Sequence, residues 1–131
     1  DKQTKEERRT LGKQAVEEVL SILDKKVQYI ELIEEFEEMQ TKESLFAKMC
    51  DKLEADIQSK IYCEEGCMDI QKAENQYLLK DARIQKLLEE GAKSISDLFV
   101  ENDRPIFTEK VFENIADYVK NNELLKLRKE T

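Results

Sequence analysis

The sequence predicts an all-α protein, a helical bundle, and three observations carry that prediction. The 131 residues include only three glycines and one proline, so residues that favour turns are scarce. Charged residues make up 40% of the chain and Glu, Lys and Leu are abundant, as in helices with solvated outer faces. Apolar residues recur at helical spacing along most of the chain. A chain of this length, with 40% hydrophobic residues, is expected to form one domain with a compact core.

Two helices are predicted in the first part of the chain. The first covers about residues 5–23 and the second about residues 26–39, with a short polar connection between them. The first helix has an apolar face at helical spacing, made of Leu11, Ala15, Val16, Val19, Leu20 and Leu23. The second is expected to bury Val27, Ile30, Ile33 and Phe36. Its many glutamates are interpreted as a solvated surface rather than an acidic binding site.

A third helix is predicted to be the central one. Thr41 is a favourable N-cap, the helix continues to about Glu64, and Gly66 is suited to a left-handed C-cap. Its predicted core stripe consists of Phe46, Met49, Cys50, Leu53, Ile57 and Ile61. A second ridge carries one carboxylate, Asp51, between Ala47 and Ala55. Small residues permit close approach of another element, so Asp51 is expected to be less exposed than Lys48 and Lys52.

The pattern loosens after Gly66. Residues 68–77 are compatible with either a helix or an irregular connection. The next predicted helix has Gly91 inside it and an apolar face made of Ile84, Leu87, Leu88, Ile95, Leu98 and Phe99. Residues 102–105 end in Pro105 and predict a turn.

Thr108 is predicted to cap a final helix. The inward side chains of that helix are expected to be Val111, Phe112, Ile115, Ala116 and Val119. The tail over residues 121–131 is polar enough to fray, although three leucines in it could dock on a partner: Leu124, Leu125 and Leu127.

Composition excludes several function classes. A net charge of −8 without basic clustering excludes long nucleic acid as an expected partner. No apolar run approaches the roughly 20 residues that span a bilayer, and no signal peptide opens the chain, so no membrane partner and a cytoplasmic location are expected.

Cys50 is expected in the core. The spacing of Cys63 and Cys67 could suit a metal or a disulfide, but two thiolates without histidines make a poor zinc site, and their role stays open.

The order of residues from Glu35 to Glu54 carries a family resemblance. Glu-Phe-Glu is followed by Thr, Glu, Phe-Ala-Lys and Asp-Lys-Leu-Glu. This order resembles the C-terminal half of HD-domain metal-dependent phosphohydrolases, in particular the 5′-deoxynucleotidase-like subgroup. Weaker similarity lies at Lys5-Glu6-Glu7-Arg8-Arg9 and Ala15-Val16-Glu17-Glu18, so the resemblance covers about residues 5–60. It implies that residues 1–131 are the C-terminal part of one HD-type helical domain, with residues 68–131 a family-variable extension.

The resemblance implies that Asp51 is the last ligand of a divalent metal, with Mn, Co, Zn, Mg and Fe all compatible. The implied reaction is hydrolysis of small phosphate esters, with nucleoside monophosphates as the expected substrates and a homodimer as the expected assembly. The chain, however, contains no histidine. The family's histidine and His-Asp pair are therefore expected upstream of Asp1, and the chain alone is expected to be inactive.

The alternative from another class is a non-catalytic helical module for dimerisation or interaction. Apolar residues such as Tyr77, Leu78 and Leu79 are compatible with such a role. A histidine and a His-Asp pair upstream of Asp1 in the parent reading frame would support the enzyme, and their absence would support the interaction module.

Overall fold

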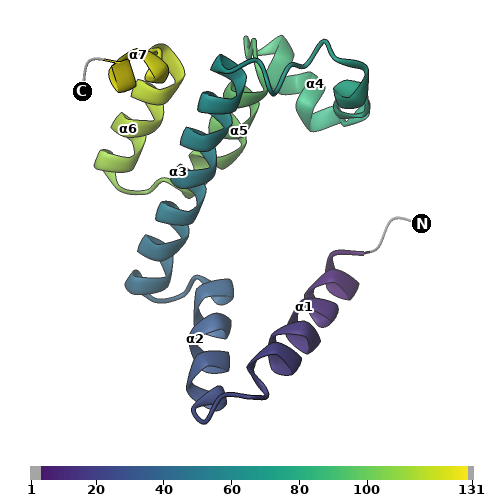
Figure 1. Cartoon of the computed structure of the whole chain (residues 1–131), viewed down its shortest axis with the longest axis vertical. Helices are drawn as coiled ribbons and strands as arrows, with labels where there is room; N and C mark the ends of the chain where they lie inside the picture. The colour runs from purple at the N-terminus through teal and green to yellow at the C-terminus, as the bar shows by residue number, and fades with distance from the viewer. Residues whose placement is uncertain (1–3, 130–131) are drawn as a thin grey trace. The chain divides into compact units, whose positions relative to one another are not determined.

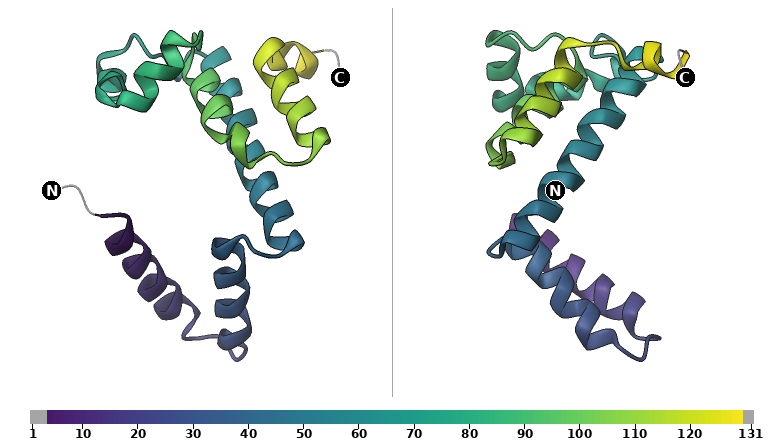
Figure 2. Two further views of the ribbon diagram at one scale, coloured as in Figure 1. Left: turned by 180° about the vertical axis from the view of Figure 1, so that it is seen from behind. Right: turned by 90° about the vertical axis from the view of Figure 1, so that its left-hand side faces the viewer.

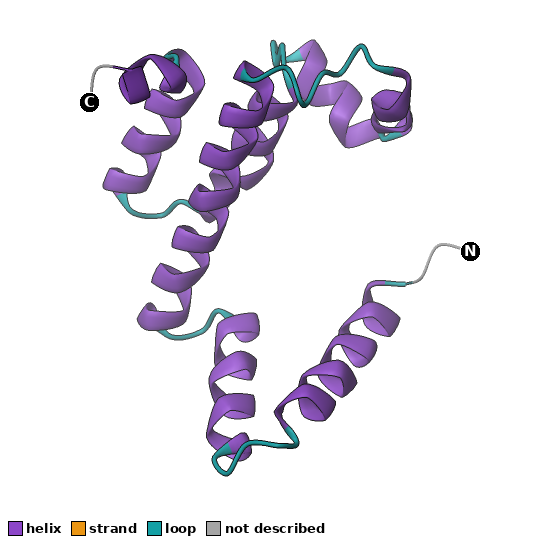
Figure 3. Ribbon diagram, viewed as in Figure 1, coloured by secondary structure: helices purple, strands orange, loops and turns teal. Residues whose placement is uncertain are grey.

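The computed structural model describes the backbone of residues 4–129 and the side chains of residues 4–72 and 77–126. The described residues form seven α helices and two short 3-10 helices and contain no strand (Figures 1 and 3). The predicted all-α class is therefore confirmed. The chain divides into two compact units, the first ending at Ala47 and the second beginning at Lys48. No helix within residues 4–129 combines the length and the apolar character needed to cross a membrane.

The first unit contains α1 (Lys5–Leu20), α2 (Lys26–Glu38) and the first turns of α3 (Lys42–Glu64). α1 begins with a capping box, in which the Glu7 amide donates to Thr4 Oγ1 (3.2 Å) and the Thr4 amide donates to Glu7 Oε2 (2.7 Å). α1 ends three residues before the predicted boundary. An ion pair joins it to α2, with 2.7 Å between Lys13 Nζ and Glu34 Oε1.

The first unit has little core of its own. Neither α1 nor α2 contains a buried residue. Of the predicted inward faces, Val16, Leu20, Ile30 and Phe36 are half-buried. The other members, which were predicted to face a core, are exposed: Leu11, Ala15, Val19, Leu23, Val27 and Ile33. Helical periodicity correctly located the helices, but within the first unit most of these side chains are left uncovered.

α3 has the predicted limits. The Ser44 amide donates to Thr41 Oγ1 (3.1 Å), which confirms Thr41 as the cap. At the other end Gly66 adopts a φ of +74° and the Cys67 amide bonds the Tyr62 carbonyl (2.9 Å), so the chain leaves the helix through a left-handed residue as predicted. Both signals are local, which explains why sequence reasoning located them.

The second unit continues with η1 (Ala73–Lys80), α4 (Ala82–Glu89) and α5 (Ile95–Asp103). Residues 68–77, whose sequence is compatible with a helix or an irregular connection, are irregular up to Lys72 and form a 3-10 helix from Ala73. The prediction of one helix running through Gly91 was wrong. Gly91 has a φ of +109°, and Ser94 Oγ accepts from the Asp97 amide (3.1 Å) to start a new helix.

The chain then forms η2 (Arg104–Ile106), α6 (Lys110–Asn121) and α7 (Leu124–Lys129). The predicted turn comes slightly later than expected, because Asp103 still belongs to α5 and Pro105 lies in η2. Thr108 does not cap α6, whose N-cap is Glu109 without a side-chain hydrogen bond. The Thr108 hydroxyl instead contacts Met49 Sδ (3.8 Å).

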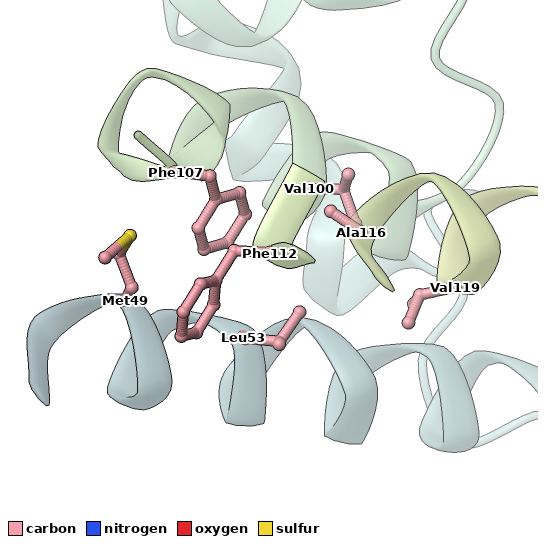
Figure 4. Close-up of a cluster of buried hydrophobic side chains, with 7 residues drawn as sticks. All are labelled: Met49, Leu53, Val100, Phe107, Phe112, Ala116 and Val119. Carbon is pink, nitrogen blue, oxygen red and sulfur yellow. The ribbon is translucent and has the colours of Figure 1, made fainter. Parts of the chain in front are cut away.

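The main core of the second unit lies between α3, α5 and α6 (Figures 2 and 4). Its buried members are Met49, Leu53, Val100, Phe107, Phe112, Ala116 and Val119. The rings of Phe107 and Phe112 stack with centroids 6.2 Å apart. A second cluster of buried side chains consists of Ile70, Ala92, Ile95 and Leu98. Every buried apolar residue of the described chain therefore lies in the second unit.

The predicted core of α3 is partly correct. Met49 and Leu53 are buried and Ile57 packs partly buried against the cluster. Phe46 is 56% exposed and Cys50 is exposed, so both core predictions were wrong. On α6 the buried residues are Phe112, Ala116 and Val119, while Val111 and Ile115 are exposed, contrary to expectation.

The C-terminal segment is helical rather than frayed up to Lys129. Glu64, at the end of α3, accepts hydrogen bonds from the amides of Leu124 (2.9 Å) and Leu125 (2.8 Å). A carboxylate at this position favours the helix both by satisfying free amides and by complementing the helix dipole. Leu124 also packs against the main core, while the side chain of Leu127 lies outside the described residues.

Candidate functional site

Asp51 lies on α3 within the second unit and is open to solvent. Its side chain is 56% exposed, against 17% for Lys48 and 32% for Lys52. The expectation that Asp51 is the most sheltered of the three was wrong. Lysine stems can lie along apolar surface while their ammonium groups reach water, whereas the short aspartate projects directly outward. Lys48 forms a long ion pair with it, with 4.0 Å between Nζ and Asp51 Oδ2.

The donor set around Asp51 is insufficient for a metal centre. No group of three or more His, Cys, Asp or Glu side chains in the described part of the chain is arranged to hold an ion. The sequence contains no histidine to supplement the carboxylate. Asp51 offers one hard oxygen ligand, whereas bound divalent ions require several ligands in fixed geometry. These residues therefore do not by themselves fit a metal.

Cys63 and Cys67 do not form a metal or disulfide site either. Both are free thiols, as is Cys50. Cys67 is exposed, whereas Cys63 packs against the second cluster. Burial raises the pKa of the Cys63 thiol, which keeps it in the neutral form. A neutral, packed thiol acts as a small apolar side chain and is a poor metal ligand.

The most unusual chemical environment in the second unit belongs to Asp56, on α3. Its side chain has no exposed surface, and neither carboxyl oxygen has a hydrogen-bond partner among the described residues. Burial is the main cause that raises its pKa to about 7, and the neighbouring Asp103 carboxylate adds to the effect. Asp103 is itself buried and pairs with Lys52 (Oδ2 to Nζ, 3.4 Å). We call Asp56, Asp103 and Lys52 the Asp56 cluster.

A second polar network lies at the end of α5. Glu101 pairs with Arg104 (Oε2 to Nε, 3.0 Å) and with Lys120 of α6 (Oε1 to Nζ, 2.7 Å). The hydrogen bond from Arg104 is the main cause that lowers the pKa of Glu101. Arg104 also reaches Asp117 (Nη2 to Oδ1, 3.0 Å). This network joins α5, η2 and α6 through paired charges.

Sequence reasoning missed Asp56, although a signal was present. Asp56 follows Met49 by seven residues and Leu53 by three, which places it on the same helical face as these two core residues. Apolar character places Phe46 and Cys50 in the predicted stripe, whereas the charge of Asp56 argues against a place in the core. The position of this carboxylate on the same face as Met49 and Leu53 is the pattern from which the burial of Asp56 could have been predicted.

In a comparison with protein families, residues 1–96 match an HD domain. This span includes α1, α2, α3 and α4 and therefore both Asp51 and the Asp56 cluster residues on α3. No curated protein matches the chain. No solved structure matches it either. Because the matched span covers well over half of the sequence, the chain belongs to the HD domain family.

Proposed function

We propose that this chain contributes to a metal-dependent phosphohydrolase acting on small phosphate esters, with nucleoside monophosphates as its substrates. The observation that carries the proposal is the HD domain match over residues 1–96. Members of this family generally bind divalent metal ions. The 5′-deoxynucleotidase-like character rests on the Asp-Lys-Leu-Glu sequence at Asp51 and on its surrounding pattern.

Asp51 is the proposed ligand because of its residue type and its accessibility. It lies in the interior of a long, well-capped helix, so its backbone is held in place. Its carboxylate is open enough to meet an ion or another polypeptide segment. Carboxylate oxygen suits hard divalent ions such as Mg²⁺ and Mn²⁺.

The remaining ligands must come from outside these 131 residues. The sequence lacks histidine, and the described side chains form no cluster that could hold an ion. The proposal thus assigns the histidine and the His-Asp pair to other sequence and treats these residues as the C-terminal part of the HD-type domain. It also assigns a cytoplasmic location, which suits three free thiols because that compartment keeps cysteines reduced.

The test is the Asp51→Asn variant of the parent protein that joins these residues to a histidine and a His-Asp pair. Phosphate release from deoxynucleoside monophosphates is measured with Mn²⁺, Co²⁺ or Mg²⁺, together with the bound metal content. Loss of a first ligand is expected to reduce turnover by at least about a hundredfold and to release metal, while helicity is unchanged.

The matched control is Glu54→Gln, which removes an exposed carboxylate one turn further along α3. It is expected to leave turnover and metal content unchanged. Wild-type turnover by Asp51→Asn would contradict the assignment of Asp51, and equal losses in both variants would mean that general charge, not ligation, is responsible.

A second candidate function is supported by the first unit. Its exposed apolar side chains and a groove of about 270 Å³ between α1 and α2 are unusual for a unit that has no further role. The α1 wall of the groove is mainly basic, with Arg8, Arg9 and Lys13 beside one acidic residue, Glu17, and the α2 wall carries acidic side chains: Glu34, Glu37 and Glu38. Opposite walls of opposite charge suit a second copy of the chain in antiparallel orientation. For such an interaction module, the Asp51 experiment would find no phosphatase activity to lose.

A further inference from the structure

Asp56 is a buried carboxyl group without a hydrogen-bond partner in the described part of the chain. Its side chain is completely buried, and both carboxyl oxygens lack a partner among the described residues. Most buried polar groups in folded proteins are paired, because leaving one unpaired costs free energy. An ionised carboxylate in such a place costs much more than a neutral one. The location therefore favours the protonated form of Asp56.

The charges around Asp56 compensate only in part for the cost of ionising it. On α3, Lys52 lies one turn before Asp56 and pairs with Asp103 (3.4 Å), while Lys60 lies one turn after it and pairs with Glu64 (3.8 Å). The side chain of Asp103, at the end of α5, is also buried and accepts a further hydrogen bond from Asn102 (Nδ2 to Oδ1, 2.8 Å). Its charge opposes a second negative charge nearby.

The remaining cations near this interface are engaged in the network at the end of α5. Arg104 of η2 pairs with Glu101 and with Asp117 of α6. Lys120 of α6 pairs with Glu101. If Asp56 ionises, the Asp56 cluster holds two buried carboxylates and one ammonium group. The charges of Lys52 and Arg104 favour ionisation, but their effect on the pKa of Asp56 is smaller than that of burial and of Asp103.

We propose that Asp56 is a proton-operated switch at the packing interface of α3 and α5. While its carboxyl group holds a proton, α3 packs tightly against α5 and α6. When the proton leaves, the new charge loosens this interface, or draws Lys52 away from Asp103. Since α3 also carries Asp51, the switch links solution pH to the helix that bears the candidate ligand.

The direction of the pH effect follows from proton binding. Burial, and then the charge of Asp103, raise the pKa of Asp56 to about 7, from an ordinary value of 3.8. At a pH between these two values, Asp56 therefore keeps its proton in the folded chain but has lost it in the unfolded chain. The stability that Asp56 contributes is fully present below the unfolded pKa, falls as the pH rises, and is lost once the pH has passed through the folded pKa.

The experiment is urea unfolding of the full chain at pH 5.5, 6.5, 7.5 and 8.5. In this range the folded state binds one more proton than the unfolded state. The wild-type unfolding equilibrium constant should therefore rise by up to about tenfold as the pH is raised from 5.5 to 6.5, with little further change above pH 7.5. Asp56→Asn should lose this dependence. Glu54→Gln, an exposed carboxylate on the same helix, should keep it. The same slope in wild type and Asp56→Asn would overturn the proposal.

A direct titration decides the matter even if Asp56→Asn fails to fold. The carbon resonance of the Asp56 carboxyl group is followed by NMR as the pH changes, in the wild-type chain and in Asp103→Asn. The wild-type midpoint is expected near neutral pH and should move to lower pH in Asp103→Asn, because that variant removes a negative charge and frees Lys52. A wild-type midpoint in the ordinary range of aspartate, or no movement in Asp103→Asn, would overturn the switch.

Discussion

In α1 and α2 no side chain is buried, whereas α5 alone buries Ile95, Ser96, Asp97, Leu98, Val100 and Asp103. All three helices carry apolar residues at helical spacing. The difference lies in the partners. In the second unit, α3, α5 and α6 each supply a layer for the others, while α1 and α2 leave Val19, Val27 and Leu32 more than half exposed. Amphipathic spacing predicts that a helix has an apolar face, but not that the same chain covers it.

The largest expected difference between the units is the cost of deleting an apolar side chain. Leu53→Ala in the main core should lower the free energy of unfolding by about 2–5 kcal/mol, because a buried leucine leaves a cavity. Leu32→Ala, at a side chain 59% exposed on α2, should cost less than about 0.5 kcal/mol. Urea unfolding followed by circular dichroism measures both.

Equal costs for the two leucines would contradict this comparison. A loss below about 1 kcal/mol for Leu53→Ala would mean that the interface between α3 and α6 is only weakly packed. A loss above about 2 kcal/mol for Leu32→Ala would mean that the face of α2 is covered in solution.

A smaller change in stability is expected when a glycine of either unit is replaced by alanine, and its sign differs between the two units. Gly66 ends α3 with a positive φ, so Gly66→Ala should destabilise the chain by roughly 1 kcal/mol through backbone strain. Gly12 lies inside α1 with open space around its Cα, so Gly12→Ala should favour the helix by about 0.5–1 kcal/mol. Thermal unfolding measures the effect of Gly66→Ala. The helix content at low temperature measures the effect of Gly12→Ala. Changes of the same sign in both variants would refute the distinction.

The features that the sequence predicted correctly depend on local chemistry. The limits of α3 follow from the hydroxyl of Thr41 and the left-handed conformation of Gly66, each of which acts within a few residues. The break at Gly91 was also locally encoded, but a single glycine within an apolar period is compatible with both a kink-free helix and a helix end. Periodicity alone did not distinguish them.

The features that were missed depend on tertiary contacts. Asp56 lies fully buried on α3, and the buried Asp103 that raises its pKa, after burial itself, comes from α5, far away in sequence. Thr108 was assigned as a cap from its residue type, yet its hydroxyl contacts Met49, 59 residues away in sequence. The candidate ligand Asp51 was found through family resemblance, because its own surroundings are those of an ordinary exposed aspartate.

The most direct test of the account is phosphate release from deoxynucleoside monophosphates by residues 1–131 alone and by a parent protein that adds a histidine and a His-Asp pair, each with Mn²⁺, Co²⁺ or Mg²⁺. The 131 residues supply one candidate carboxylate and no histidine, so they should be helical but show no turnover and retain no metal after dialysis. The parent should hydrolyse the substrates and retain metal. Turnover by the 131 residues alone would contradict the claim that Asp51 completes a site whose other ligands lie elsewhere.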